Sequence, residues 1–195
     1  YLLPLIDSLR SLNPRRILDA GSGRGLFTFY LAKTFPQADV LGIDLDEEAI
    51  RRNNRTARAC GLTNCRFEVM DVRSLAQAGA GYDLILSVDN LEHLEEDQAQ
   101  CHVFFESLAP GGRMIVHTPH ITRNLFGWRR PNFMGIEGHV RPGYSLDGLT
   151  GMLENAGFEI DDAFYGYDSM ETLANDVSYL ITGGREKRKG LYALA

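Results

Sequence analysis

Short runs of Val, Ile and Leu alternate with segments that favour helices along most of the chain. The apolar runs predict strands at about 15–20, 38–44, 64–70, 82–88 and 112–118. The segments beside and between them predict helices at about 2–12, 25–34, 46–60 and 95–108, with a weak helical turn near 73–78. Nearly continuous apolar strands that alternate with helices are typical of a parallel sheet covered on both faces and connected by right-handed crossovers. The pattern therefore predicts an α/β fold, a three-layer α/β/α sandwich.

The pattern changes after Ser145, which is expected to cap a helix that ends near Ala156. Apolar residues then predict strands at 158–166 and 177–182, joined by a short polar connection. Two consecutive strands without a crossover helix indicate an antiparallel pair at the edge of the sheet. The sequence contains no internal repeat or low-complexity linker, so residues 1–195 are expected to form a single domain.

The most informative motif joins the first predicted strand to the helix that follows it. Gly21, Gly23 and Gly25 come directly after the apolar run, and glycine lets the backbone approach a ligand because it has no Cβ and accepts positive φ. The turn leads to the amino end of a helix, where free N–H groups face the ligand. Asp44 ends the second strand about 20 residues further on, where a carboxylate accepts both hydrogens of a ribose diol. The chain is therefore expected to bind a nucleoside-containing cofactor.

The spacing of the glycines distinguishes between such cofactors. The dinucleotide fingerprint Gly-x-Gly-x-x-Gly requires its third glycine at the position of Leu26. The third glycine is instead Gly25, and Asp19 precedes the first glycine by two residues. The motif Asp-x-Gly-x-Gly-x-Gly resembles the first motif of the class I S-adenosylmethionine-dependent methyltransferases.

Four further matches to that family follow in the right order, and the first is Asp44, which matches its ribose-binding acid. Segments 68–72, 82–89 and 108–116 are similar to the end of its third strand, its fourth strand and the Leu-x-Pro-Gly-Gly turn into its fifth strand. The resemblance implies a Rossmann-like, mostly parallel seven-stranded sheet with an antiparallel closing strand. It also implies S-adenosyl-L-methionine as the methyl donor and S-adenosyl-L-homocysteine as the product.

The resemblance further implies roles for residues around the cofactor. Asp19, Asp44 and Asp71 would contact the methionine ammonium, the ribose and the adenine amino group, respectively, and Ser87 would lie beside the methionine. The complete implied set is Asp19, Gly21, Gly23, Gly25, Asp44, Leu45, Asp71, Val72 and Ser87. Alternatives remain open, since the glycines could serve only tight packing and Asp71 could be an ordinary turn residue. Asp44 could be a helix cap, but Asp46 already suits that role.

Methyl transfer from a sulfonium mainly requires alignment of the reacting atoms, and an oxygen nucleophile gains from a general base. Histidine is the natural candidate because its pKa lies near 6.5. His93 follows the fourth strand and His139 precedes the Ser145 helix, so both are predicted as general-base candidates, with a structural role as the alternative for each. His102 is predicted to lie on a surface of its helix and to be inert, whereas His117 and His120 flank Pro119 at the end of the fifth strand.

Residues 119–144 are too long for a simple connection and are predicted to form a lid or substrate-binding insertion. The segment carries the aromatic and apolar residues Phe126, Trp128, Phe133, Met134 and Tyr144 together with Arg123, Arg129, Arg130 and Arg141. One hypothesis is that the aromatics enclose an organic substrate while an arginine pairs with an anionic group on it. The alternative is that these arginines pair with surface acids of the protein.

Composition narrows the range of partners. The 195-residue chain has a formal net charge of −6, which is poorly suited to holding nucleic acid because such binding depends on Lys and Arg at phosphates. No apolar run approaches the ~20 residues needed to cross a bilayer, and no signal peptide is visible. The three cysteines are odd in number and lack a metal-ligand spacing, so we expect no metal site and a cytoplasmic location.

Both ends of the chain look cut, and the termini of the whole protein are expected to lie outside it. The basic tail at 185–189 precedes an apolar stretch, which is consistent with a helix that contacts a membrane surface or with a plain solvated helix end. Nothing in the sequence fixes an oligomeric state.

The best functional hypothesis is a methyltransferase that acts on a small organic or lipid-like acceptor through oxygen, nitrogen or carbon. The sequence lacks the Asn/Asp-Pro-Pro-aromatic run of amino methyltransferases that act on DNA bases, because Val88-Asp89-Asn90-Leu91 stands there. Two other functions remain open. A NAD-dependent Rossmann oxidoreductase would share the sheet and the ribose acid, and a non-catalytic subunit would keep the methyltransferase fold without the activity.

Overall fold

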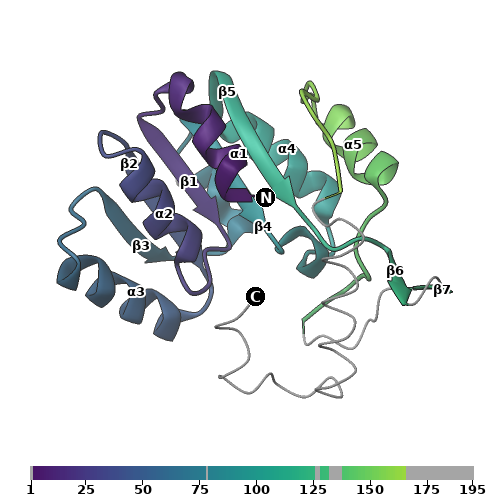
Figure 1. Cartoon of the computed structure of the whole chain (residues 1–195), viewed down its shortest axis with the longest axis horizontal. Coiled ribbons are helices and arrows are strands. Elements are labelled where there is room, and N and C mark those ends of the chain that lie inside the picture. Colours follow the sequence, from purple (N-terminus) through teal and green to yellow (C-terminus); the bar gives the residue numbers. More distant parts are fainter. Residues whose placement is uncertain (1, 78, 126–127, 132–137, 166–195) are drawn as a thin grey trace.

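The computed structural model describes residues 2–77, 79–125, 128–131 and 138–165. Its strands are β1 (Arg16–Ala20), β2 (Asp39–Asp44), β3 (Cys65–Val69), β4 (Tyr82–Val88) and β5 (Leu108–His117). They form one parallel sheet in the order β3-β2-β1-β4-β5 (Figure 1). The predicted strands are therefore confirmed within one residue at every end except the start of β5. That strand begins earlier because it absorbs the Pro110–Gly112 turn as an irregularity in its pairing with β4.

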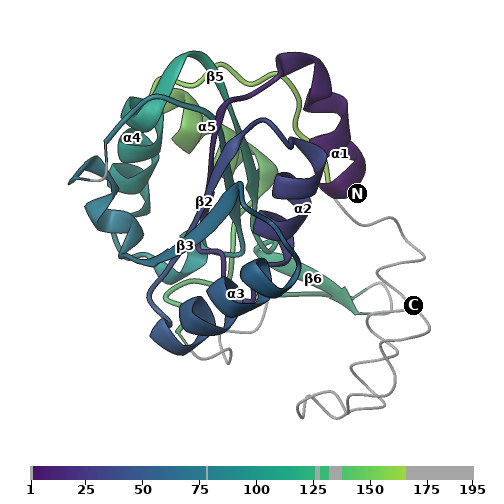
Figure 2. The same ribbon diagram turned by 90° about the vertical axis from the view of Figure 1, so that its left-hand side faces the viewer.

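Helices cover both faces of the sheet, as the sequence predicts (Figure 2). The structure has α1 (Leu2–Ser8), α2 (Leu26–Thr34) and α3 (Glu47–Ala59) on one face and α4 (Asp97–Ser107) and α5 (Leu146–Asn155) on the other. Adjacent residues of β1 point into the two separate cores. Ile17 packs in one cluster with α1, α2 and α3, whereas Leu18 packs in another with α4 and α5. The three-layer α/β/α arrangement is confirmed.

The caps that the sequence predicts hold the starts of two helices. The Asp46 carboxylate accepts hydrogen bonds from the N–H groups of Glu48 and Ala49 at the start of α3, and Ser145 Oγ accepts one from Gly148 N–H at the start of α5. The leading helix is shorter than predicted and continues as the 3-10 helix η1 (Leu9–Leu12). The weak turn predicted near 73–78 is the 3-10 helix η2 (Val72–Gln77).

The predicted antiparallel closing pair is absent from the part of the chain that the structure describes. Residues 158–165 form no strand, so that prediction is wrong there, and the partner predicted at 177–182 lies outside the described residues. Phe158 instead packs edge-on against Phe105 of α4, with ring centroids 5.3 Å apart. The apolar residues after α5 therefore contribute to the helical core without pairing to the sheet.

A small antiparallel pair of strands that was not predicted lies within the expected lid. It consists of β6 (Thr122–Leu125) and β7 (Trp128–Pro131), which pair in register from Thr122 with Pro131 to Leu125 with Trp128. In Figure 1 it extends beyond the carboxyl end of β5. Within the described ranges, no helix has the length and apolarity needed to cross a membrane.

Gly42 in the middle of β2 illustrates how tightly the first layer is packed. A Cβ at this position would lie 2.7 Å from Phe67 Cδ1 and 2.7 Å from Thr28 Oγ1. We predict that Gly42→Ala lowers the free energy of unfolding by about 1–3 kcal/mol, because overpacking forces neighbouring side chains to move. The measurement is urea unfolding followed by circular dichroism.

Gly151→Ala is the matched control for this prediction. Gly151 lies inside α5 and has no atom within 4 Å of an added Cβ, so alanine should stabilise the helix by about 0.5–1 kcal/mol. Equal effects of the two substitutions on the free energy of unfolding would contradict the packing argument.

Candidate functional site

The carboxyl ends of β1, β2 and β4 meet at one edge of the sheet. The chain leaves β1 toward β2 on one side and reaches β4 on the other, so this edge is the topological switch point of the sheet. Ligands of open α/β sheets bind at this place. The residues predicted from the sequence to bind a cofactor lie here, at the ends of β1, β2, β3 and β4.

The glycine turn after β1 is held by backbone hydrogen bonds to the end of β2. The N–H groups of Gly21 and Ser22 both donate to the Ile43 carbonyl, at 3.0 and 2.8 Å. Gly21 and Gly23 have φ angles of 82° and 46°, which glycine adopts without strain. A Cβ on Gly21 would lie 3.0 Å from the side chain of Asn90, whereas a Cβ on Gly23 would meet no atom within 4 Å. The turn therefore needs glycine for its conformation, and at Gly23 it faces open space.

Asp44 connects this turn to the start of α3. Its Oδ2 accepts a 2.7 Å hydrogen bond from Gly23 N–H, and its Oδ1 accepts a 2.9 Å bond from Asp46 N–H. Each carboxylate oxygen keeps a further lone pair, so the group can still accept hydrogen bonds from a ligand. Leu45 beside it exposes 64% of its surface. This places an acceptor for hydroxyl groups directly beside an uncovered apolar side chain.

Asp19 lies beneath the glycine turn and is almost completely buried. Its carboxylate accepts a 2.6 Å hydrogen bond from Thr28 Oγ1–H. Burial raises the pKa of Asp19 to about 6, and the hydrogen bonds from Thr28 oppose this shift. Ser22 Oγ is also buried, and it has no hydrogen-bond partner among the described residues. Ser22 Oγ is thus less well satisfied than buried polar groups usually are, whereas Asp19 has a partner but lies where burial disfavours its charge.

Asp71 is occupied by its neighbour Arg73. The guanidinium makes hydrogen bonds to both carboxylate oxygens, and Arg73 N–H donates a further bond of 2.9 Å. These contacts lower the pKa of Asp71, the side-chain hydrogen bonds from Arg73 being the largest cause. Val72 is buried, and its carbonyl accepts a hydrogen bond from Gln100 Nε2. The contacts with Arg73 are the ones expected if Asp71 is an ordinary turn residue, which is the alternative interpretation. The contact of Asp71 with adenine stays a prediction.

Two side chains that the sequence analysis missed support the turn. Asn53 on α3 is buried and donates from Nδ2 to the Gly23 carbonyl at 2.9 Å. Asn90 lies against Gly21 and donates a long 3.4 Å hydrogen bond from Nδ2 to Ser87 Oγ. Asn53 is a polar residue on a helix with many charged side chains, but only the folded structure shows that it is buried and faces the turn.

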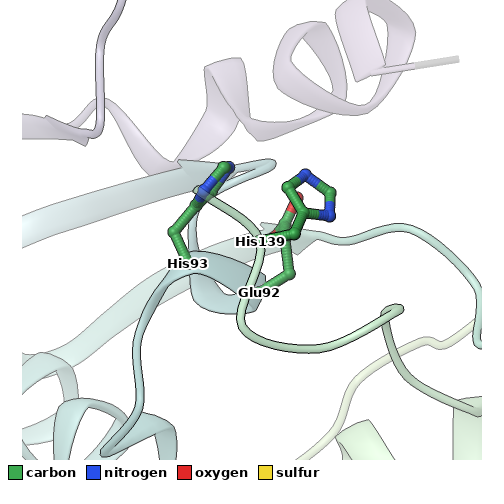
Figure 3. A group of neighbouring side chains, drawn as sticks. All are labelled: Glu92, His93 and His139. Carbon is green, nitrogen blue, oxygen red and sulfur yellow. The ribbon is translucent and has the colours of Figure 1, made fainter. Parts of the chain in front are cut away.

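A second group of polar side chains lies where β4 ends. Glu92 and His93 belong to the 3-10 helix η3 (Leu91–His93), and His139 comes from a segment that crosses beside it (Figure 3). The potential ligand atoms of these three residues all lie within 4.8 Å of one another. The structure therefore brings together the two predicted general-base candidates, and it adds Glu92, which was not predicted.

The electrostatics of this group follow from burial. Glu92 is fully buried, and burial raises its pKa to about 7. Burial also lowers the pKa of His139, and the neighbouring His93 lowers it further. The rings of the two histidines are nearly perpendicular, with centroids 4.5 Å apart. Glu92 and His139 are therefore both shifted toward their neutral forms.

The segment that carries His139 is fixed to η3 and α4. Val140 N–H donates to the Glu92 carbonyl at 3.0 Å, and Tyr144 Oη–H donates to Asp97 at 2.8 Å. The Arg141 guanidinium also binds Asp97 and donates to the Leu94 carbonyl at 2.6 Å. Arg141 thus pairs with an acid of the protein, which is the alternative interpretation of the lid arginines.

Most of the residues singled out in the predicted lid have side chains outside the described part of the structure. They are Phe126, Trp128, Phe133, Met134, Arg123, Arg129 and Arg130.

The other three histidines are all described. His102 is exposed on α4, as predicted. His117 pairs with Asp89, at 2.8 Å between Nδ1 and Oδ1. His120 packs edge-on against Tyr165.

Comparison with known families identifies the class of protein. Residues 13–140 match a family model described as a methyltransferase domain, and the chain belongs to this family. This agrees with the resemblance to class I methyltransferases that the glycine motif and the strand ends indicate.

Curated relatives include both O- and N-methyltransferases. The chain is 28% identical over 197 residues to a ubiquinone biosynthesis O-methyltransferase of Sinorhizobium fredii, covering 91% of this chain and 76% of that enzyme. It is 33% identical over 113 residues to phosphoethanolamine N-methyltransferase 1 of Triticum aestivum, covering 57% of this chain and 22% of that enzyme. The chain thus spans only about a fifth of the wheat enzyme's length.

Two solved structures share the fold. The [4+2]-cyclase SpnF superposes with a TM-score of 0.66 at 24% identity, covering 83% of this chain and 57% of that one. The N-terminal domain of EvdMO1, solved with S-adenosylhomocysteine bound, superposes with a TM-score of 0.59 at 22% identity, covering 80% and 71%. At these identities the likeness concerns the fold alone.

The buried acid Asp19 leads to a prediction about stability and pH. Its folded-state pKa of about 6 lies above the ordinary value, so its contribution to stability falls as pH rises from about 4 to about 6. Above about pH 6 the buried charge of Asp19 lowers the free energy of unfolding by about 3 kcal/mol. We predict that Asp19→Asn is more stable than the unmodified chain by about 1–3 kcal/mol at pH 7.5 and gains nothing at pH 4.

Urea unfolding at both pH values gives the free energy of unfolding of the two proteins. The difference between the proteins removes the contribution of all other titrating groups, because these groups are the same in both. Asp39→Asn is the control, because Asp39 is exposed and its ion pair with Arg66 contributes little. An Asp19→Asn protein that is less stable at pH 7.5 would contradict the assignment of strain to the buried carboxylate.

Proposed function

We propose that this chain is an S-adenosylmethionine-dependent methyltransferase that transfers a methyl group to a small organic or lipid-like acceptor. The observation that carries the proposal is the pairing of Asp44 with the glycine turn at the switch point of the sheet. That arrangement combines a hydroxyl-binding carboxylate with close backbone approach. Membership in the methyltransferase-domain family supports it.

The residues present fit such a cofactor. Asp44 would accept hydrogen bonds from the ribose hydroxyls, and the exposed Leu45 would cover the adenine. Asp19 would balance the methionine ammonium, and this gives a reason for a buried acid whose charged form is strained. Among the described residues, Ser22 Oγ has no hydrogen-bond partner and nothing covers Gly23, which is consistent with a ligand lying over the turn. When bound, the cofactor supplies a methyl group that its own sulfonium charge already activates.

The acceptor is expected beside the end of β4, where His93 and His139 lie together. Their role as general bases for an oxygen acceptor remains our proposal, as does an anionic acceptor held by the arginines of the lid. The proposal covers methyl transfer to oxygen, nitrogen or carbon of the acceptor. According to their names, the two curated relatives methylate oxygen and nitrogen. The [4+2]-cyclase SpnF shares the fold but is named for a different reaction.

The other two functions are less well supported. A nicotinamide-dependent oxidoreductase does not account for the early third glycine at Gly25 or for the family match. A non-catalytic subunit would need no acceptor site, and it gives no reason for the grouping of Glu92, His93 and His139 just after Asn90, whose side chain lies against Gly21 of the glycine turn.

The proposal predicts binding of S-adenosylhomocysteine and not of NAD. At 100-fold saturation the ligand should stabilise the fold by about 2.7 kcal/mol, which a thermal-shift measurement detects. Asp44→Asn should weaken binding about 10- to 100-fold, because hydrogen bonds to a charged group contribute about 1.5–3 kcal/mol. Isothermal titration calorimetry gives the dissociation constants.

Asp39→Asn is again the matched control, since it removes an acid from the opposite end of the same strand. It should leave the affinity for S-adenosylhomocysteine unchanged. A thermal shift with NAD alone, or equal affinities of Asp44→Asn and the unmodified chain, would refute the proposed cofactor site. Binding without turnover of any acceptor in a screen with labelled methyl donor would favour the non-catalytic subunit.

A further inference from the structure

The group formed by Glu92, His93 and His139, here called the EHH cluster, has a composition that the methyl-transfer reaction does not itself require. One carboxylate and two imidazoles converge from two segments that are 46 residues apart in sequence. Figure 3 shows all three side chains on the same side of the local backbone, with the carboxyl group of Glu92 close to the ring of His139.

The side chain of Glu92 is a buried carboxylate whose charged form is poorly compensated. The residue has 0% relative exposure, and neither Oε1 nor Oε2 has a hydrogen-bond partner among the described residues. A buried carboxylate without partners is costly and is usually paired, protonated or bound to a metal ion. The lone pairs of its two oxygens are therefore available to a cation.

Contacts of the backbone and of neighbouring side chains hold the cluster together. The hydrogen bond from Val140 N–H to the Glu92 carbonyl joins its two segments directly. Tyr144 Oη, whose hydroxyl hydrogen is donated to Asp97, also lies 3.1 Å from the carbonyl oxygen of Leu91, one residue before Glu92. A Cβ on Gly138 would lie 3.2 Å from His93 Nδ1, and the φ of 86° at this residue favours glycine. The convergence is thus built by groups that are not themselves ligands.

We propose that Glu92, His93 and His139 form a binding site for a divalent transition-metal ion such as Zn²⁺ or Co²⁺. Two imidazoles with one carboxylate are a donor set that Zn²⁺ and Fe²⁺ bind, whereas Mg²⁺ and Ca²⁺ prefer oxygen ligands. Metal–ligand bonds of about 2.0–2.2 Å require the three ligand atoms to move closer together than their present spacing. Rotation of the histidine side chains provides that movement, since His93 is exposed and His139 half-buried.

Three protein ligands leave at least one coordination position open. The EHH cluster follows β4, at the place where the proposed function puts the acceptor, and this part of the inference rests on that function. An acceptor hydroxyl bound to the ion would release its proton to solvent more readily, because a bound cation lowers the pKa of an attached hydroxyl or water. The resulting oxygen would take the methyl group while the sulfonium sulfur leaves as a neutral thioether. With the ion bound, His93 and His139 would hold it, and the general-base role proposed for them applies to the chain without the ion.

Titration of the chelator-treated full chain with Co²⁺, followed by visible absorption, tests the site. We expect one Co²⁺ per chain and displacement of Co²⁺ by Zn²⁺. Glu92→Gln and His139→Gln should each weaken Co²⁺ binding more than about 100-fold, because loss of an outer-shell partner alone costs 10- to 100-fold. His102→Gln is the matched control, since it removes an exposed histidine from α4 and should change nothing. A bidentate oxygen chelator, acetohydroxamic acid, should change the Co²⁺ spectrum if positions are open.

Co²⁺ binding that persists in both Glu92→Gln and His139→Gln would assign the ion to another place and overturn the proposal, as would the absence of binding. If acetohydroxamic acid leaves the Co²⁺ spectrum unchanged, the claim that the bound ion has an open coordination position is wrong. The thermal shift with S-adenosylhomocysteine, measured on the same variants, reports that they are folded. If the unmodified chain binds S-adenosylhomocysteine but not Co²⁺, only the metal site is contradicted. If it binds Co²⁺ but not S-adenosylhomocysteine, only the proposed function is contradicted.

Discussion

The attachment of the glycine turn to the end of β2 is the constraint on which the rest of this site depends. Two N–H groups of the turn share the Ile43 carbonyl, and the next one donates to the Asp44 carboxylate. The same carboxylate also accepts a hydrogen bond from Asp46, whose side chain caps α3. One acid thus fixes the end of β1, the end of β2 and the start of a helix relative to one another. Together with Asn53, which donates to the Gly23 carbonyl, it fixes the position of the open backbone at Gly23.

This arrangement places two kinds of polar group at the same edge of the sheet. Asp44 is half-buried and well satisfied, whereas Asp19 and Glu92 are buried with pKa values raised by desolvation. Carboxyl groups in such surroundings reduce the stability of the empty protein, and they gain when a cationic group arrives. In our account the methionine ammonium fills this role at Asp19 and a divalent ion fills it at Glu92. Binding would then relieve strain that folding alone leaves in place.

Features encoded by neighbouring residues could be predicted from the sequence. The five strands, the positive-φ glycines and the caps Asp46 and Ser145 depend on local patterns, and the structure contains all of them. The start of β5 was misplaced because a Pro-Gly-Gly turn is usually a strand boundary, yet here the strand runs through it. The predicted strand after α5 failed because apolar residues such as Phe158 pack equally well against a helix.

Contacts between distant segments could not be predicted in this way. Nothing local indicates that Glu92 lies beside His139, or that Arg141 binds Asp97 rather than a substrate, because these contacts depend on how one segment crosses another. The pairing of Asp71 with Arg73 is different, since the two residues are only two apart and a turn was already the alternative. The absence of a metal-ligand spacing among the cysteines likewise carried no information about a site made from separate segments.

A crystal structure of the chain with S-adenosylhomocysteine tests the central claim most directly. We predict that both ribose hydroxyls donate to the Asp44 carboxylate while the glycine turn keeps its bonds to Ile43, with the ammonium group near Asp19. Ligand bound away from the turn, or Asp44 bonded only to Gly23 and Asp46 beside a bound ribose, would contradict it.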